Sequence, residues 1–194
     1  MAPFVLGSAT SNDPAPTLPE SAPPSNSNWR TCGSTWLLYG EIDSPTVGHA
    51  LASIRSAPPD LPLLLLIDSC GGLAHSTLGL MVELRRFASL ETRAIAFCAS
   101  AAVHLLQAGK LRTCYPHTCF FTHALQAEET TVDGSTIKTF ADQFARDTRS
   151  WIDVLVSRST KPRRFWSHWF KTEHYFEPSD ALKFGLIDKI VDQP

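Results

Sequence analysis

The chain carries little charge and has no long apolar run. Of its 194 residues 19% are charged, and the formal net charge is −2. This near balance provides no basic surface for nucleic acid or for an anionic membrane. The longest apolar stretch, residues 94–108, is shorter than the roughly 20 residues that a membrane-spanning helix needs. We therefore expect neither nucleic acid nor a membrane as a partner.

Basic residues are missing from the start of the chain. Residues 1–28 contain no Lys or Arg, so they lack the positively charged beginning of a secretory signal peptide. They hold six of the 14 prolines and show no apolar periodicity. This composition indicates a disordered tail or a propeptide over residues 1–29, followed by one folded domain over residues 30–194.

The histidines and cysteines form no familiar metal-binding motif. His168 and His174 flank Glu173, but their spacing fits no known ligand pattern and no cysteine pair accompanies them. The five cysteines are odd in number, and Cys98 lies inside an apolar run, which favours reduced thiols. We expect a cytoplasmic protein without a metal or another cofactor.

Apolar runs alternate with helical patterns through the first half of the chain. Such alternation is typical of an α/β fold. The strand predicted at residues 61–67 is apolar throughout, as in a parallel sheet that is covered on both faces. Strands are predicted at 35–39, 61–67, 93–97, 111–115, 119–123 and 187–191. Helices are predicted at about 44–56, 75–87, 101–108, 135–159 and 178–184, with an aromatic-rich turn at 165–170.

Ser100 lies where a predicted strand changes into a predicted helix. A hydroxyl at this point is held beside the unpaired N–H groups and the positive dipole end of the helix, where a developing oxyanion is stabilised. This is the setting of a nucleophile. The same position also suits a serine that only caps the helix.

Two further features follow predicted strands. Gly71 and Gly72 come after the strand at 61–67, and His123 ends a later strand. Because ligands of open parallel sheets bind beyond the carboxyl ends of the strands, we expect both features to lie near Ser100. Taken singly, the glycines are also explained by a tight turn and His123 by a structural role.

Four segments, in this order, resemble the Clp protease proteolytic subunit (ClpP) and its phage-type relatives, whose fold is similar to that of the crotonase superfamily. The resemblance extends from about residue 36 to residue 191. The four segments are 66–72, similar to the INSPGG turn; 97–102, similar to the nucleophile motif G-x-A-A-S-M-[GA]; 116–123, similar to PNSRxMIH; and 181–188, similar to EA-x-x-YGLID. This resemblance implies an α/β fold of repeated β-β-α units with a protruding handle helix.

The resemblance also assigns chemical roles. It makes Ser100 the nucleophile and His123 the general base that accepts its proton, because a free serine hydroxyl is a poor nucleophile. The backbone N–H groups of Gly71 and Ala101 are expected to form the oxyanion hole. Glu173 falls at the position of the triad acid, where ClpP has an aspartate.

Several positions depart from the ClpP pattern. Cys70 replaces a proline, Asp68 an asparagine, and residues 124–125 the Gln-Pro that follows the catalytic histidine. Asp133 and Asp142 are fallback acids, because a glutamate at position 173 has an additional methylene. His104, four residues after Ser100, is expected in the core or in a pocket wall. The N-terminal sequences of ClpP are not recognisable in residues 1–30, so docking to an ATPase stays open.

From these residues we expect a serine endopeptidase that hydrolyses peptide bonds through an acyl-enzyme. The resemblance implies a homo-oligomeric ring that acts on unfolded proteins or peptides, with an AAA+ unfoldase as a possible partner. Two alternatives stay open. One is a catalytically inactive ClpP-like subunit that contributes structure or regulation to a ring. The other is a crotonase-type acyl-CoA enzyme, which would not need the pair Ser100 and His123.

Overall fold

The computed structural model describes residues 26–126 and 135–192. These residues form eight strands and six helices. The strands are β1 (Trp29–Cys32), β2 (Thr35–Ile42), β3 (Pro62–Gly72), β4 (Ser89–Ala99), β5 (Leu111–Cys114), β6 (Cys119–Thr122), β7 (His174–Phe176) and β8 (Lys189–Ile190). The helices are α1 (Ser44–Ser56), α2 (Ala74–Leu84), α3 (Ala101–Leu106), α4 (Ile137–Arg158), α5 (Arg163–Trp169) and α6 (Pro178–Phe184).

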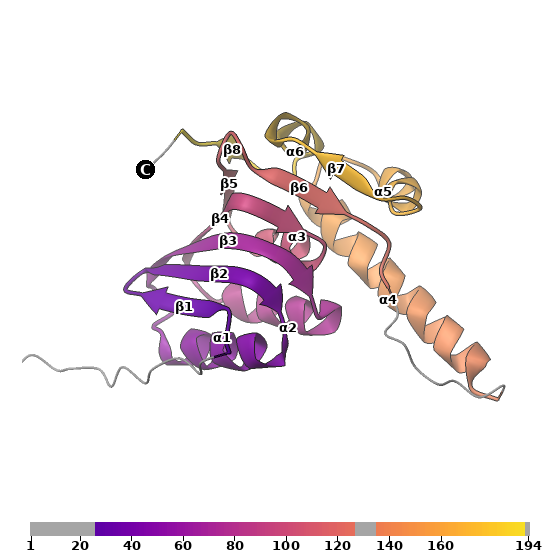
Figure 1. Ribbon diagram of the computed structural model, residues 1–194, viewed down its shortest axis with the longest axis horizontal. Helices are drawn as coiled ribbons and strands as arrows, with labels where there is room; N and C mark the ends of the chain where they lie inside the picture. Colours follow the sequence, from indigo (N-terminus) through magenta and orange to yellow (C-terminus); the bar gives the residue numbers. More distant parts are fainter. Residues whose placement is uncertain (1–25, 127–134, 193–194) are drawn as a thin grey trace, which may run out of the picture.

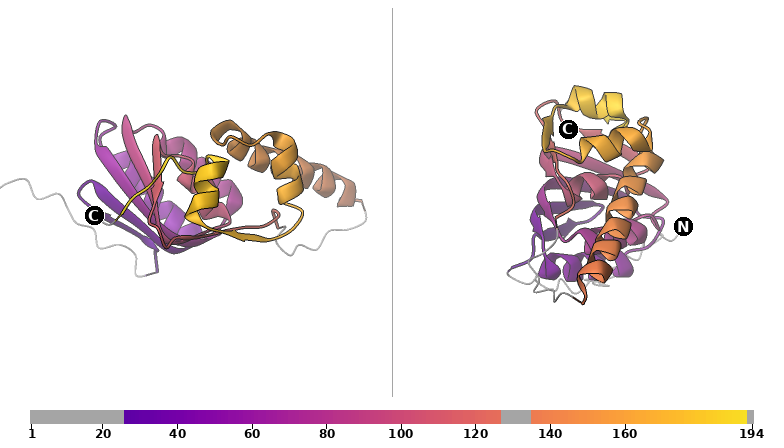
Figure 2. Two further views of the ribbon diagram at one scale, coloured as in Figure 1. Left: turned by 90° about the horizontal axis from the view of Figure 1, so that it is seen from above. Right: turned by 90° about the vertical axis from the view of Figure 1, so that its right-hand side faces the viewer.

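All eight strands belong to one sheet, in the order β1-β2-β3-β4-β5-β8, with β6 between β4 and β7. β1 and β7 run antiparallel to their neighbours, and the other pairings are parallel. The first part of β4 pairs with β5 and its last part, Phe97–Ala99, pairs with β6. Figures 1 and 2 show α1, α2 and α3 against one face of the sheet, while α4 runs away from the body. The predicted α/β class is confirmed.

Helix α4 is held to the body by its second half. Trp151, Ile152 and Leu155 are buried, whereas Ile137 and Phe140 near its start are 56% and 40% exposed. The predicted protruding helix is therefore present (Figure 1). None of the helices in residues 26–126 and 135–192 combines the length and the apolar composition needed to cross a membrane.

The local signals predicted the helix ends better than the strand ends. The helix predicted at 44–56 has the bounds of α1, and the Asp43 side chain caps it by accepting a hydrogen bond from the Thr46 N–H at 2.9 Å. Gly185, with a φ of 74°, ends α6. The short strands β1 and β7 were not predicted. The strand predicted at 61–67 is longer in the structure, because pairing with β2 continues to Gly72.

Most of the predicted N-terminal tail, residues 1–25, lies outside the described residues. Its last four residues are anchored to the domain. The Ser27 hydroxyl contacts His49 Nδ1 at 3.1 Å, and the Asn28 N–H donates to the Thr46 hydroxyl at 3.0 Å. The folded part therefore includes residues 26–29, and Trp29 is fully buried.

Arg112 on β5 joins several late segments of the chain. Its guanidinium is 8% exposed and bonds both carboxylate oxygens of Asp188, at 2.5 and 3.0 Å. It also donates to Gln107 Oε1 and to the carbonyl oxygens of Arg158 and Gly185, at 2.7 to 2.8 Å. The buried cation is thus fully paired, and it holds the ends of α3, α4 and α6 beside the sheet.

Replacing Asp188 by Asn should leave Arg112 buried without its charge partner. Because the Asp188 side chain is 36% exposed and only Arg112 is buried, we expect a loss of about 2 kcal/mol in the free energy of unfolding, below the roughly 3–5 kcal/mol of a fully buried pair. Urea denaturation at pH 7 measures this loss. Asp153→Asn is the matched control: the ion pair of Asp153 with Arg163 is about half exposed on both sides, and we expect it to contribute less than about 1 kcal/mol.

The Asp188 contribution also depends on pH. Burial raises the pKa of Asp188, but hydrogen bonds from Arg112 outweigh burial and leave this pKa below its usual value. The stabilisation is therefore present above the unfolded-state pKa of about 3.9 and is lost as the pH falls through the lower folded-state pKa. The difference between the protein and its Asp188→Asn variant should narrow below about pH 4; a constant difference would contradict the assignment.

Candidate active site

Ser100 occupies a strained turn between β4 and α3. Its φ and ψ are 53° and −119°, and it is the one residue other than glycine with a positive φ among the described residues. The Ser100 N–H donates to the Phe121 carbonyl of β6 at 2.8 Å, and the Ser100 carbonyl accepts from the Val103 N–H at 3.1 Å. These two bonds fix the Ser100 backbone at the start of α3.

The end of β3 lies directly against this turn. Gly71 has a φ of 94°, and a Cβ at this position would be 2.8 Å from Ala101 N, Ala99 O and Ser100 Cβ. Any side chain would therefore collide with the turn. The expected proximity of Gly71, Ser100 and Ala101 is present.

The two expected oxyanion donors differ in their present partners. Ala101 is the first residue of α3, so its N–H has no acceptor within the helix. The Gly71 N–H donates to the Ser69 hydroxyl at 3.1 Å, and this hydroxyl donates to the Gly40 carbonyl at 2.5 Å. The Gly71 amide is thus occupied by a buried serine that sequence analysis did not single out.

His123 follows β6 and lines the same cleft as Ser100. Its Nδ1 lies 2.7 Å from the Ala124 carbonyl oxygen. Because a carbonyl can only accept, Nδ1 carries the proton, and in the neutral ring Nε2 is left with a free lone pair. This is the tautomer that a base acting through Nε2 needs. Within residues 26–126 and 135–192, no hydrogen bond joins His123 to Ser100 or Glu173.

Glu173 lies next to His123 along the paired strands. Thr122 at the end of β6 pairs with His174 at the start of β7, so His123 and Glu173 directly adjoin this last pair. Trp169 holds the two strands together: its Nε1–H donates to the Thr122 hydroxyl at 2.8 Å, and its ring stacks on His174 at 3.8 Å. The Glu173 side chain is exposed and is not among the residues that line the cleft.

The fallback acids are less well placed. Asp142 is exposed on α4 and does not line the cleft, and Asp133 lies outside the described residues. His168 is exposed on α5. In the part of the chain that the structure describes, no three side chains of His, Cys, Asp or Glu are grouped as a metal ion would require.

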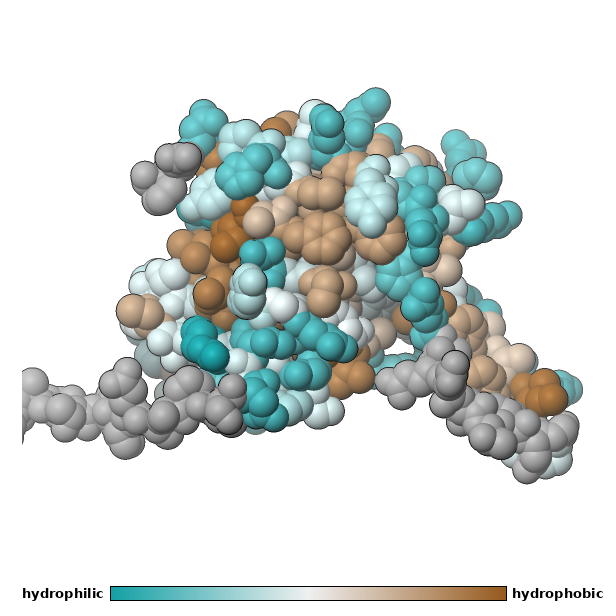
Figure 3. Space-filling view, viewed as in Figure 1, coloured by the Kyte–Doolittle hydropathy of each residue, from teal (hydrophilic) through white to brown (hydrophobic). Residues whose placement is uncertain are grey.

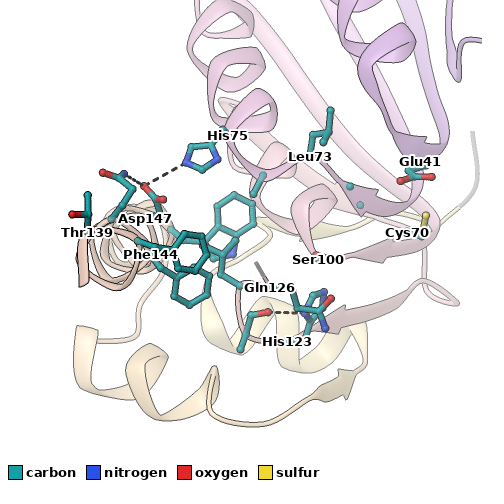
Figure 4. Close-up of a pocket in the computed structure, with 18 of the residues that line it drawn as sticks. Glu41, Cys70, Leu73, His75, Ser100, His123, Gln126, Thr139, Phe144 and Asp147 are labelled. Atoms are coloured by element: carbon teal, nitrogen blue, oxygen red, sulfur yellow. Dashed lines mark hydrogen bonds and ion pairs between the residues drawn. The ribbon is translucent and has the colours of Figure 1, made fainter. Parts of the chain in front are cut away.

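A cleft of about 980 Å³ extends from Ser100 to α4. On the α4 side it is lined by three aromatic residues, Phe140, Phe144 and Trp151, and by three polar ones, Thr139, Gln143 and Asp147. Figure 4 shows His75 of α2 facing Asp147 of α4 across the cleft; their nearest atoms are 3.3 Å apart. The sequence predicted the helix that carries these aromatic residues but did not indicate that they line a cleft. No sequence signal indicates the contact between His75 and Asp147, because it depends on how α2 and α4 lie in space.

Comparison with known proteins supports the same family as the motifs. The chain is similar to the ATP-dependent Clp protease proteolytic subunit 4 of Streptomyces avermitilis, with 26% identity over 158 residues, covering 78% of this chain and 70% of that protein. A family model described as Clp protease matches residues 37–194, which include the Ser100 turn, His123 and Glu173. Since this match extends over most of the chain, the protein belongs to the Clp protease family.

Proposed function

We propose that this chain is a serine endopeptidase that cleaves peptide bonds through an acyl-enzyme. The observation that carries the proposal is the strained turn at Ser100, which lies against Gly71 and opens into the cleft that His123 also lines. A serine that only capped α3 would bond an N–H of the first turn, but Ser100 makes no side-chain cap bond to α3. Membership of the Clp protease family supports a peptidase.

In the proposed reaction Ser100 Oγ attacks the carbonyl carbon of the scissile peptide, and its proton passes to His123 Nε2. The tetrahedral oxyanion accepts hydrogen bonds from the N–H groups of Ala101 and Gly71. For this step Gly71 exchanges the neutral Ser69 hydroxyl for an anion, which is the stronger acceptor. Collapse of the intermediate expels the amine, which takes the proton from His123. Water then repeats the sequence and releases the acyl group.

The third member of the proposed triad is Glu173. Its carboxylate would replace the Ala124 carbonyl as the acceptor of the His123 Nδ1–H and would stabilise the imidazolium that forms during the reaction. His123 is half-buried and Glu173 is exposed at the end of the β6–β7 pair, so this rearrangement needs side-chain rotation and no change in strand pairing.

The second candidate function is an inactive ClpP-like ring subunit. It is favoured by one observation: Ser100 and His123 are not hydrogen bonded to each other in residues 26–126, where both are described. We prefer the peptidase for two reasons. The His123 tautomer with the hydrogen on Nδ1 leaves Nε2 free to accept a proton, and the Ser100 turn is strained.

We also propose that the chain forms a homo-oligomeric ring, as the family suggests. Figure 3 shows apolar side chains gathered on the sheet face that the helices leave open. Half-buried Leu37, Leu64, Leu66 and Phe97 alternate along β2, β3 and β4 with residues that face the helices. A second copy would cover this surface. The proposed substrates are unfolded proteins or peptides in the cytoplasm. The Streptomyces relative is named as a subunit of an ATP-dependent protease, and we propose an AAA+ unfoldase as the partner of this chain.

An alkyl fluorophosphonate probe should label the purified protein at Ser100. The expected result is labelling that disappears in Ser100→Ala and falls by roughly 10³-fold or more in His123→Ala, because the hydroxyl then lacks its base. Intact-mass and peptide mass spectrometry locate the label. An assembled, folded protein that does not react would support the inactive ring subunit instead.

Replacing Glu173 by Gln should test the triad acid. We expect kcat for a fluorogenic peptide to fall by roughly 10²–10⁴-fold with little change in melting temperature, because an amide cannot stabilise the imidazolium. Glu177→Gln is the matched control, since Glu177 is also exposed, lies just after β7 and makes no side-chain cap bond. Unchanged kcat in Glu173→Gln would mean that the Ala124 carbonyl alone orients His123.

Replacing Leu66 by Glu should disrupt the proposed ring. A charge on the open sheet face would have to lose its water when a second copy covers it, at a cost of several kcal/mol. We expect analytical ultracentrifugation to show smaller species for this variant. Val82→Glu is the control, because Val82 is 67% exposed on α2, which covers the other face. An unchanged sedimentation profile of Leu66→Glu would place the subunit contact elsewhere.

A further inference from the structure

His104 lies between the nucleophile turn and the wall of the cleft. It is 1% exposed, on α3 one helical turn after Ser100. Its ring stacks on that of Trp151 of α4, with the centroids 3.5 Å apart and the planes at 20°. Its Nε2 is 3.2 Å from the Trp151 carbonyl oxygen, and its Nδ1 is 3.4 Å from the Ser100 carbonyl oxygen.

The imidazole has one N–H for these two acceptors. Burial lowers the pKa of His104 to about 3, although the two carbonyl oxygens oppose this shift, so the ring is neutral at physiological pH. A neutral ring donates from one nitrogen only. The shorter contact, from Nε2 to the Trp151 carbonyl, indicates that Nε2 carries the hydrogen.

Space filling alone does not explain an imidazole at this place. A phenyl ring would stack on Trp151 equally well without bringing polar nitrogens into the core, where burying a polar group is costly. The hydrogen bond from His104 also joins two elements with separate tasks. Helix α3 carries Ser100 and Ala101 at its start, and α4 carries one wall of the cleft, including Trp151.

We propose that His104 is a positioning residue, which fixes the α4 wall of the cleft relative to Ser100 through its hydrogen bond to the Trp151 carbonyl. The inference rests on the proposed peptidase function. The cleft wall on α4 would position a bound peptide, whereas the start of α3 positions the Ser100 hydroxyl. The reaction requires that the scissile carbonyl lies at the correct distance from this hydroxyl. Displacements of about 1 Å between a bound substrate and a reacting group can cost as much as 10²-fold in rate.

Three substitutions separate the hydrogen bond from the ring. His104→Phe keeps the aromatic stack and removes both nitrogens. His104→Gln places an amide N–H near the position of Nε2, and His104→Asn places one near the position of Nδ1. We expect kcat for a fluorogenic peptide to fall about tenfold in His104→Phe and His104→Asn, with KM within about twofold, and to return to within about threefold in His104→Gln.

The labelling rate with the fluorophosphonate probe distinguishes a displaced cleft wall from general damage to the fold or to Ser100. It is small, so its reaction with Ser100 depends little on the α4 wall, and the labelled fraction counts the folded sites. We expect the labelling rates of all three variants to stay within about threefold of the unsubstituted protein while kcat per labelled site falls as stated. Equal losses in labelling and in peptide cleavage, or an equal kcat in His104→Phe and His104→Gln, would overturn the proposal.

Phe170→Leu is the packing control. Phe170 is buried against the same ring, with its centroid 6.2 Å from that of His104, and it makes no side-chain hydrogen bond. We expect a lower melting temperature with unchanged kcat per labelled site. A kcat reduced as far as in His104→Phe would mean that packing, and not the hydrogen bond, positions the wall.

One measurement does not depend on activity. Ring ¹⁵N chemical shifts of His104 in the full chain should show a neutral imidazole with the hydrogen on Nε2. A hydrogen on Nδ1 would overturn the proposed bond to Trp151. If the unsubstituted protein is not labelled by the probe, the peptidase proposal fails; the tautomer still decides whether His104 joins α3 to α4.

Discussion

The close approach of the Gly71 backbone to the turn at Ser100 is the constraint on which the site depends. With Ala99 O, Ala101 N and Ser100 Cβ all 2.8 Å from a hypothetical Cβ, the two loops can meet only where one of them has no side chain. The surrounding polar groups are arranged to hold this contact. The Asp68 carboxylate accepts from the Phe97 N–H at 3.0 Å, close to the register shift between β3 and β4. Ser69 holds Gly71 from the other side.

The same contact separates a rigid half of the site from an adaptable half. Ser100, Gly71 and Ala101 are set by strands and by the start of α3, and their relative positions cannot change without breaking backbone hydrogen bonds. The half-buried His123 and the exposed Glu173 lie at the end of a short strand pair. The strained Ser100 turn is thus held by the core of the domain. The contact between His123 and Glu173, in contrast, needs only rotation of their side chains.

Local sequence signals predicted those parts of the structure that depend only on residues close together in the chain. The Asp43 cap, the Gly185 helix end and the placement of Ser100 between a strand and a helix follow from neighbouring residues. The motifs also brought Gly71, Ser100 and His123 to one cleft. The strands β1 and β7 could not be predicted in this way, because they have four and three residues and are defined by their partners.

The missed parts of the site have the same origin. The hydrogen bond from the Gly71 N–H to Ser69 lies in the part of β3 that continues beyond the predicted strand end at residue 67. The contact between His104 and Trp151 depends on how α3 packs against α4, and no pattern within either helix indicates this packing. Glu173, by contrast, was named from the family resemblance; its position beside His123 depends on the β6–β7 register, and Trp169 of α5 holds these two strands together.

The hydrogen-bond network around Arg112 has a consequence for folding during protein synthesis. Arg112 is synthesised long before its partners on Arg158, Gly185 and Asp188 leave the ribosome. Until then a cation that is buried in the finished domain has no counter-charge, so its burial is unfavourable and the sheet edge at β5 stays open. We therefore expect Arg112 to become buried only when the chain that carries its partners is available. The sheet edge beside β5 would then be completed only after residues 158–188 had been synthesised.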